Sequence, residues 1–285
     1  MGHELIDPHS AQVKRLRRLK RRDGRSAAGQ FVAEGVNASR EALTAHAADR
    51  AVVRELIVSS EARSRYSDVI GLAEECGIFV TSASDAVLAA VSDTVTPQGI
   101  VAVVNMLDMQ LSELLIRRPG LIAVLADVRD PGNAGSVIRA ADAAGADGVV
   151  FAGESVDVYN SKVVRSSVGG LFHLPISCAD AASKSVIDVM TKAREIGLQV
   201  LVADGSGDAE LDSPEVDALL ARPTAWVFGN ESWGVPESVA AAADAVVRIP
   251  IYGRAESLNV ATAAALCLYA SARAQRQSGG DRQSS

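Results

Sequence analysis

The sequence of 285 residues has few cysteines and histidines, and neither set is grouped. Cys76, Cys178 and Cys267 are far apart without a CxxC spacing, and the four histidines are scattered along the chain. This distribution argues against a disulfide framework and against a zinc site. We therefore expect a reducing, cytoplasmic environment and no metal ion.

Long apolar runs are also missing. No run reaches the ~20 residues that a membrane-spanning helix needs, and the charged N-terminus lacks the apolar core of a secretory signal. Aromatic residues make up 4% of the chain and hydrophobic residues 48%. This composition, rich in Ala and Val, is typical of an α/β protein. We expect no membrane partner, and two domains are the default for this length.

Acidic residues outnumber basic ones, and the net charge of −7 would by itself argue against a nucleic-acid partner. The basic residues are nevertheless concentrated near the N-terminus, at Lys14, Arg15, Arg17, Arg18, Lys20, Arg21, Arg22 and Arg25. Leu16 and Leu19 interleave with them at helical spacing, which predicts one basic helix over residues 10–25. Such a helix can lie along a phosphate backbone. A solvated surface helix is the alternative.

The N-terminal part of the chain alternates between strand and helix patterns. The predicted strands cover residues 30–34, 52–59, 78–81 and 99–106, and the predicted helices cover 36–47, 61–76 and 84–91, the last with Ser84 as its cap. This spacing predicts a small α/β domain. We place a basic extension at residues 1–28, this domain at 29–107, and a linker with a short helix at 108–120.

The second domain, residues 121–276, alternates strictly. The predicted strands are 121–127, 148–151, 173–176, 198–203, 224–229 and 245–249, and the predicted helices are 134–144, 161–168, 180–196, 236–243 and a long final helix. Short apolar strands followed by helices predict a mainly parallel sheet covered on both faces. The polar residues 277–285 are expected to be disordered.

The final helix follows a strand that Pro250 and Gly253 break. Ser257 is the predicted N-cap, because its hydroxyl can accept a hydrogen bond from an early helix N–H group. The helix is rich in small residues and apolar on more than one face, so we expect it to be buried.

Three strand-end loops are candidates for chemistry, because ligands in such sheets bind outside the carboxyl ends of the strands. The loops are 127–135, which leads into a helix with Arg139, then 228–236, and then 249–259. The first loop lacks the GxGxxG pattern of dinucleotide-binding proteins. From the residues alone, Arg139 is either a ligand-binding arginine or one whose stem packs on the helix. Glu231 is a base, a ligand holder or a turn residue.

These loops resemble the three motifs of the SpoU/TrmH family of RNA ribose 2′-O-methyltransferases, in the SPOUT class. The matching residues are Asn133, Gly135 and Arg139 in the first motif, Gly229, Glu231 and Gly234 in the second, and Ile249, Pro250, Ser257, Leu258 and Asn259 in the third. The resemblance covers about residues 121–275. The segment FVAEGVNASREAL from Phe31 resembles, more weakly, the start of the family's RNA-binding domain, which is similar to a kink-turn-binding ribosomal protein.

The resemblance implies a deep trefoil knot, with the final helix threaded through a loop, although chain-threading rules would argue against one. It also implies a homodimer whose active site lies at the subunit interface. The implied methyl donor is S-adenosyl-L-methionine, bound by backbone groups near Gly229, Ile249 and Leu258. Gly234 and the strand end at Ala203 are further expected cofactor contacts.

The resemblance also implies roles for individual side chains. Arg139 matches the residue usually assigned to catalysis. Because a guanidinium rarely gives up its proton, we expect it to bind the target phosphate or to stabilise the developing alkoxide. Asn133 and Ser257 are expected to orient the 2′-hydroxyl or Arg139, Asn259 to hold the loops together, and Glu231 to organise the second loop.

RNA is the expected partner. Arg165 matches a family position that binds RNA phosphate in the partner's site, with a plain surface arginine as the alternative. Arg17, Arg18, Arg21 and Arg22 are the candidate phosphate contacts of the basic helix. An extra N-terminal domain suits a large structured RNA, so 23S ribosomal RNA is the first choice, tRNA the second, and a non-catalytic RNA-binding protein the rival class.

Overall fold

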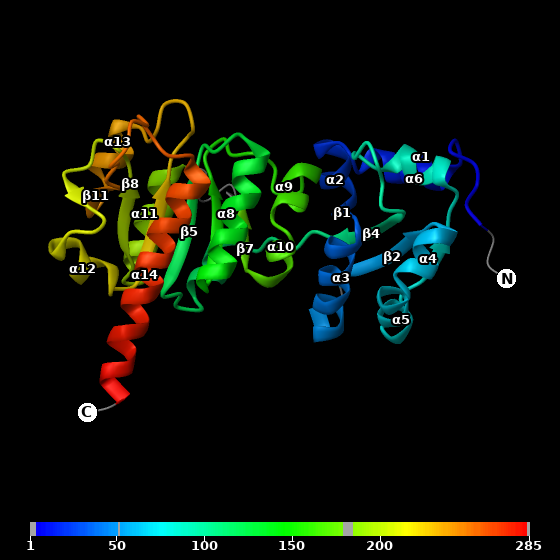
Figure 1. Ribbon diagram of the computed structural model, residues 1–285, viewed down its shortest axis with the longest axis horizontal. Helices are drawn as coiled ribbons and strands as arrows, with labels where there is room; N and C mark the ends of the chain where they lie inside the picture. The colour runs from blue at the N-terminus through cyan, green and yellow to red at the C-terminus, as the bar shows by residue number, and fades with distance from the viewer. Residues whose placement is uncertain (1–3, 51, 179–184, 284–285) are drawn as a thin grey trace. The chain divides into compact units, whose positions relative to one another are not determined.

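The computed structural model describes residues 4–50, 52–178 and 185–283 (Figure 1). The chain forms two compact units. The first contains the chain up to Leu107 together with Tyr159–His173, and the second contains Asp108–Val158 and the chain from Leu174. The segment Tyr159–His173 therefore packs with the first unit, although the sequence pattern alone assigns it to the second domain. No helix in the described ranges is long and apolar enough to cross a membrane.

The first unit is built on a sheet with the strand order β1-β4-β2-β3. The strands are β1 (Gln30–Glu34), β2 (Val53–Val58), β3 (Val80–Ser82) and β4 (Ile100–Asn105). Strand β4 is antiparallel to β1 and to β2, whereas β2 and β3 are parallel. These strands lie within or close to the segments that the alternation predicts.

The helices of this unit before residue 107 are α1 (Ala11–Arg18), α2 (Arg22–Ala28), α3 (Val36–Ala45) with a π-helical turn at His46–Arg50, α4 (Ser60–Arg65), α5 (Ser67–Glu75) and α6 (Asp85–Val91). The Ser84 hydroxyl accepts a hydrogen bond from Val87 N, which confirms the predicted cap of α6. The single helix predicted over residues 61–76 is wrong, because Tyr66 has a non-helical backbone that separates α4 from α5.

The prediction of one basic helix over residues 10–25 is also wrong. The chain turns between α1 and α2, and the guanidinium of buried Arg25 donates hydrogen bonds to the carbonyl oxygens of Leu19 and Lys20, at 3.1 and 2.9 Å. At Gly24, an added Cβ would lie 2.1 Å from the Arg18 carbonyl oxygen, so only glycine fits there. The turn therefore depends on two residues that a charge count treats as parts of a continuous helix.

The basic segment is also part of the core. Val13, Leu16 and Leu19 are buried in one cluster with residues of α6, β2 and β4. Arg17, Arg18, Arg21 and Arg22 are exposed. The segment therefore presents its arginines to solvent while its apolar residues help to hold the first unit together.

The second unit contains a seven-stranded sheet in the order β7-β6-β5-β10-β8-β11-β9, in which every pairing is parallel. Its strands are β5 (Leu121–Ala126), β6 (Gly148–Ala152), β7 (Ile176–Cys178), β8 (Gln199–Ala203), β9 (Ala209–Glu210), β10 (Thr224–Phe228) and β11 (Ala245–Arg248). The expected parallel sheet is confirmed. The expected strand over 173–176 is wrong, since residues 170–173 are helical and the strand begins at Ile176.

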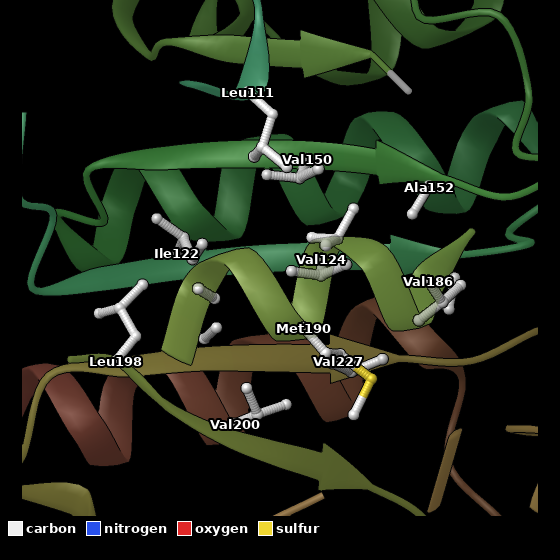
Figure 2. Packing of buried hydrophobic residues seen from close by; sticks show 14 of the residues in the cluster. Leu111, Ile122, Val124, Val150, Ala152, Val186, Met190, Leu198, Val200 and Val227 are labelled. Carbon is white, nitrogen blue, oxygen red and sulfur yellow. The ribbon is translucent and has the colours of Figure 1, made fainter. Parts of the chain in front are cut away.

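The helices after residue 107 are α7 (Leu111–Leu115), α8 (Pro131–Ala144), α9 (Ser161–Ser166), α10 (Gly170–His173), α11 (Val186–Glu195), α12 (Pro214–Leu220), α13 (Glu237–Ala241) and α14 (Val260–Gln283). Of these, α9 and α10 belong to the first unit. Figure 2 shows Met190 and Val186 of α11 packed beside Val124, Val200 and Val227 of the strands. Helices α8 and α14 pack against each other and against β5 (Figure 1).

The final helix differs from the sequence-based expectation at both ends. It begins at Val260, and Asn259 rather than Ser257 caps it, since Asn259 Oδ1 accepts a hydrogen bond from Ala261 N at 2.9 Å. It continues to Gln283, whereas the composition predicts disorder over 277–285, and residues 284–285 lie outside the described ranges. Asn259 is suited to be the cap, because its side chain forms hydrogen bonds with the helix and with a neighbouring loop at once.

Only one side of this helix is buried. Ala264, Cys267, Leu268 and Ser271 are buried, and Ser271 accepts a hydrogen bond from the indole of Trp226 at 2.9 Å. In contrast, Leu266 is 44% exposed and Tyr269 is 51% exposed. The expected burial of this helix therefore holds for one side and not for the side of Leu266 and Tyr269 in the single chain.

Candidate active site

A cavity of about 500 Å³ lies at the carboxyl ends of β8, β10 and β11. The residues that form its wall are Asn133, residues 203–205, residues 228–232, Gly234, Val247, Ile249, Ile251, residues 256–260 and Ala263. All three predicted loops therefore reach one cavity, together with the strand end at Ala203. Because these elements belong to the second unit, the cavity is formed within that unit.

The second loop is a tight turn closed by its own backbone. Asn230 and Gly234 exchange backbone N–H···O bonds of 2.9 and 3.0 Å. A Cβ at Gly229 would lie 2.5 Å from the carbonyl carbon and oxygen of Gly234, so the two glycine backbones are in direct contact. Gly234 itself has φ +67°, in the left-handed region that favours glycine. These glycines line the cavity with backbone and carry no side chain that would fill it.

Asn133 joins the three loops. Its Nδ2 donates a hydrogen bond to Glu231 Oε1 at 3.0 Å, and its Oδ1 accepts one from Asn259 Nδ2 at 2.8 Å. Asn133 is held in turn by Asp130, which caps α8 and accepts a hydrogen bond from Asn133 N at 2.8 Å. Since Asn259 caps α14, the start of α8, the second loop and the start of α14 are linked through one side chain.

A second link joins the first and second loops. Asn230 is buried, and its Nδ2 donates to the carbonyl oxygen of Asp127 at 2.7 Å. Asp127 has φ 56°, and its Oδ1 accepts a hydrogen bond from Glu154 N at 2.7 Å. Sequence reasoning missed Asn230 and Asp127 as site residues. The signal available was a polar residue directly after a buried strand for Asp127, and one glycine beyond a buried strand for Asn230.

The third loop forms a hydrogen bond with the segment 209–220, which contains β9 and α12 and which the sequence pattern did not predict. Tyr252 Oη donates to Asp212 Oδ2 at 2.5 Å, and this hydrogen bond, together with the Asp212 charge, raises the pKa of Tyr252. Arg248 Nε donates to Glu210 Oε1 at 3.2 Å. Asp204 also lines the cavity, and its Oδ1 accepts hydrogen bonds from Ser206 N and Oγ at 2.9 and 2.7 Å.

The structure brings most of the predicted site residues together. Those that line the cavity are Asn133, Ala203, Gly229, Glu231, Gly234, Ile249, Ser257, Leu258 and Asn259. Gly135 is buried in α8, whereas Arg139 is exposed on that helix and does not line the cavity. Arg139 therefore has access to solvent near the first loop, but it does not complete the cavity of its own chain.

The predicted RNA-binding residues lie in the first unit. Arg165 of α9 is half-buried, and its Nη1 is 3.7 Å from Oε2 of buried Glu34. Arg17, Arg18 and Arg21 line a basic cavity of about 690 Å³ with Lys14 and Lys20. Arg22 is exposed beside them. Among the described residues, no group of three or more His, Cys, Asp or Glu side chains is placed to hold a metal ion.

Two regions of the chain match known families. Residues 120–269 match the SpoU rRNA Methylase family, and residues 10–102 match the MRM3-like substrate binding domain. A 23S rRNA (guanosine(2553)-2′-O)-methyltransferase of Bacillus subtilis is 33% identical over 269 residues, which covers 93% of this chain and 98% of the relative. A 23S rRNA (uridine(2479)-2′-O)-methyltransferase of Streptomyces viridochromogenes is 38% identical over 185 residues, 64% of this chain and 62% of the relative.

Solved structures agree with these relatives. An rRNA methyltransferase from Sinorhizobium meliloti with bound S-adenosylmethionine has a TM-score of 0.77 and 28% identity, covering 95% of this chain and 97% of that one. The SpoU methyltransferase AviRb from Streptomyces viridochromogenes, in complex with the same cofactor, has a TM-score of 0.75 and 31% identity, covering 95% and 100%. The three loops and the parallel sheet agree with these matches, and the chain belongs to the SpoU rRNA methylase family.

Proposed function

We propose that this chain transfers a methyl group from S-adenosyl-L-methionine to a ribose 2′-hydroxyl of 23S ribosomal RNA. The observation that carries the proposal is the cavity in which the loops of all three motifs are joined through Asn133. Relatives that share most of this chain's length are named as 23S rRNA 2′-O-methyltransferases, which supports the reaction and the RNA.

The cavity fits the proposed cofactor. Its volume of about 500 Å³ is within the range of small-molecule sites. Gly229 and Gly234 bring bare backbone to the cavity wall, and Ile249 and Leu258 add apolar walls, which suits an adenine and a ribose. When bound, S-adenosylmethionine supplies a methyl group that its sulfonium already activates. The residues of the chain then have to position the ribose oxygen in line with that methyl group.

Arg139 is proposed to act on the RNA rather than on the cofactor. A guanidinium stays charged at physiological pH, so Arg139 binds a phosphate or stabilises the negative charge that develops on the 2′-oxygen. Asn133 and Asn259 hold the loops in register, Glu231 fixes the second loop through Asn133, and Ser257 is free to orient the hydroxyl. The ribose oxygen gains the methyl group, and the proton of the 2′-hydroxyl leaves to solvent water.

A homodimer is proposed to complete the site. Arg139 lies on the exposed side of α8 and outside the cavity of its own chain. The neighbouring helix α14 exposes Leu266 and Tyr269. A second copy placed on this surface would cover the apolar side chains and set an arginine at each site. The exposed surface and the position of Arg139 support this arrangement.

The remaining expectations from the family resemblance are also proposals. We expect a deep trefoil knot at the C-terminus, and the return of α14 from β11 to the side of α8 is compatible with it. The first unit is proposed to bind RNA, with a fold similar to a kink-turn-binding ribosomal protein, which the substrate-binding match over residues 10–102 supports. We also propose a cytoplasmic location. The proposed domain limits are 1–28, 29–107, 108–120, 121–276 and 277–285.

The test is methyl transfer in vitro. Purified protein is incubated with S-adenosylmethionine carrying a tritiated methyl group and with unmodified 23S rRNA, 16S rRNA or tRNA transcripts. The proposal predicts label in the 23S transcript and one nucleotide resistant to alkaline cleavage, because a 2′-O-methyl group blocks attack on the phosphate. Label in tRNA only, or cofactor binding without transfer to any transcript, would contradict it.

A further inference from the structure

The two tryptophans of the chain have opposite environments. Trp226 in β10 is fully buried, whereas Trp233 in the second loop is 53% exposed. Glu231, Ser232 and Gly234 line the cavity, but Trp233 does not. The indole therefore lies outside the proposed cofactor site, on the same short turn that forms its wall. A large exposed aromatic side chain next to such a site marks a contact surface.

A charged partner holds this indole in place. The guanidinium carbon of Arg129 lies 5.1 Å from the centre of the Trp233 ring, within the range of a cation–π contact. Arg129 Nη2 also donates a hydrogen bond to Glu154 Oε2 at 2.8 Å, which fixes the guanidinium. Arg129 thus occupies one face of the ring. The exposed surface of Trp233 is therefore the part of the indole that Arg129 does not cover.

The loop that carries Trp233 is closed by several hydrogen bonds. Asn230 and Gly234 exchange two backbone hydrogen bonds, and Asn230 Oδ1 accepts a third from Ser232 N at 2.8 Å. Asn230 is anchored to the end of β5 through the Asp127 carbonyl oxygen. A side chain mounted in this way loses little conformational freedom when a ligand stacks on it, which favours binding.

A flat aromatic ring beside a fixed cation suits a ligand that is flat on one part and negatively charged on another. An unpaired nucleotide has both features, because its base stacks on aromatic rings and its phosphate attracts a guanidinium. We propose that Trp233, held by Arg129, is a stacking site for an unpaired base of the RNA substrate, beside the ribose that enters the cavity. This inference rests on the proposed function, since it places the base next to the methylated sugar.

Fluorescence gives a direct test. In full-length protein titrated with poly(U) at low salt, stacking quenches Trp233, while buried Trp226 keeps its emission. The variant Trp233→Phe leaves Trp226 as the single tryptophan, so the quench should vanish although Phe still stacks. Anisotropy of labelled poly(U) should show that Trp233→Phe binds within about threefold of wild type and that Trp233→Ala binds about tenfold more weakly. Arg129→Gln should reduce both the affinity and the quench.

Three results would overturn the inference. The first is a failure of the RNA assays: Trp233→Ala binds poly(U) as tightly as wild type, or wild type does not bind poly(U), or it binds without a change in Trp233 emission. The second is a loss of S-adenosylmethionine affinity in Trp233→Ala, measured by calorimetry, which would make the indole part of the cofactor site. The third is a change in the oligomeric state of Trp233→Ala in solution, which would make the indole a subunit contact.

The outcomes separate this inference from the proposed function. If wild type methylates 23S rRNA while Trp233→Ala binds RNA and turns over as well as wild type, only the stacking site is wrong. If poly(U) quenches Trp233 but wild type neither binds S-adenosylmethionine nor transfers its methyl group, the stacking site stands and the proposed reaction is wrong.

Discussion

The amide of Asn133 donates a hydrogen bond to Glu231 across 98 residues of sequence, with 3.0 Å between Nδ2 and Oε1. The Oδ1 atom of the same Asn133 amide accepts a hydrogen bond from Asn259 Nδ2, 126 residues away, at 2.8 Å. One side chain therefore holds together the start of α8, the glycine turn after β10 and the start of α14. The amide is suited to this position because it can donate and accept at the same time.

Replacing Asn133 by Ala should loosen all three loops. A hydrogen bond of this kind contributes about 0.5–1.5 kcal/mol, so S-adenosylmethionine affinity should fall by about threefold to tenfold. Calorimetric titration measures the change. Asn259→Ala should have a similar effect, and the double variant should lose less than the sum, because both substitutions break the same hydrogen bond. Strictly additive losses would show that the two amides act independently.

Gly229→Ala should abolish cofactor binding and lower the melting temperature. The new Cβ would lie 2.5 Å from the Gly234 carbonyl carbon, so the turn after β10 would have to move. Gly71→Ala in α5 is the matched control, since no atom lies within 4 Å of its added Cβ and alanine favours a helix. The control should melt at or slightly above the wild-type temperature. A Gly229→Ala protein with normal affinity would mean that the turn is not the cofactor wall.

Exchanging Arg17, Arg18, Arg21 and Arg22 together for Ala should weaken RNA binding and flatten its salt dependence. Removing one arginine–phosphate pair reduces the slope of log affinity against log salt by about 0.7–0.9. These side chains are exposed, so the fold should survive. Filter binding at several salt concentrations measures the slope, and an unchanged slope would remove this segment from the RNA-binding surface.

Removing residues 1–25 is not an equivalent experiment, because Val13, Leu16 and Leu19 belong to the core of the first unit. Arg25→Ala is an informative comparison. It removes the hydrogen bonds to the Leu19 and Lys20 carbonyl oxygens, and it should lower stability without changing the salt slope. A thermal melt and the same filter assay separate the two effects.

Cys267 gives a prediction for pH. Burial raises the pKa of this thiol far above its ordinary value of 9.0, so the folded chain keeps the proton where the unfolded chain releases it. The stability associated with the neutral thiol is therefore complete below pH 9.0 and decreases as the pH rises above it. Cys267→Ser should reduce this alkaline loss of stability relative to wild type. In native protein a thiol reagent should label Cys76 and Cys178 before Cys267.

The sequence predicts the parts of the site that depend on local chemistry. Gly229, Gly234 and Asn259 stand in loops that follow strands, where glycine and asparagine break regular structure. The parallel sheet follows from short apolar strands separated by helices. These features need only the identity of neighbouring residues. The structure confirms the parallel sheet, and Gly229, Gly234 and Asn259 line one cavity in it.

Other features depend on contacts between distant residues, and a local pattern does not contain them. Asn259 replaces Ser257 as the cap because Asn133 binds its second amide atom. The basic segment bends because the Arg25 side chain bonds the carbonyl oxygens of the preceding turn. Strand β9 has two residues, too few to show an alternation, and it forms by pairing with β11.

The most direct measurement of the central claim compares Arg139→Ala with wild type in two assays, calorimetry with S-adenosylmethionine and methyl transfer to a 23S rRNA transcript. Arg139 lies outside the cavity, so the variant should bind the cofactor with wild-type affinity. Its turnover should fall by about a hundredfold or more, because the variant lacks the charge that stabilises the transition state. Normal turnover, or a loss of cofactor binding with folding intact, would contradict the account.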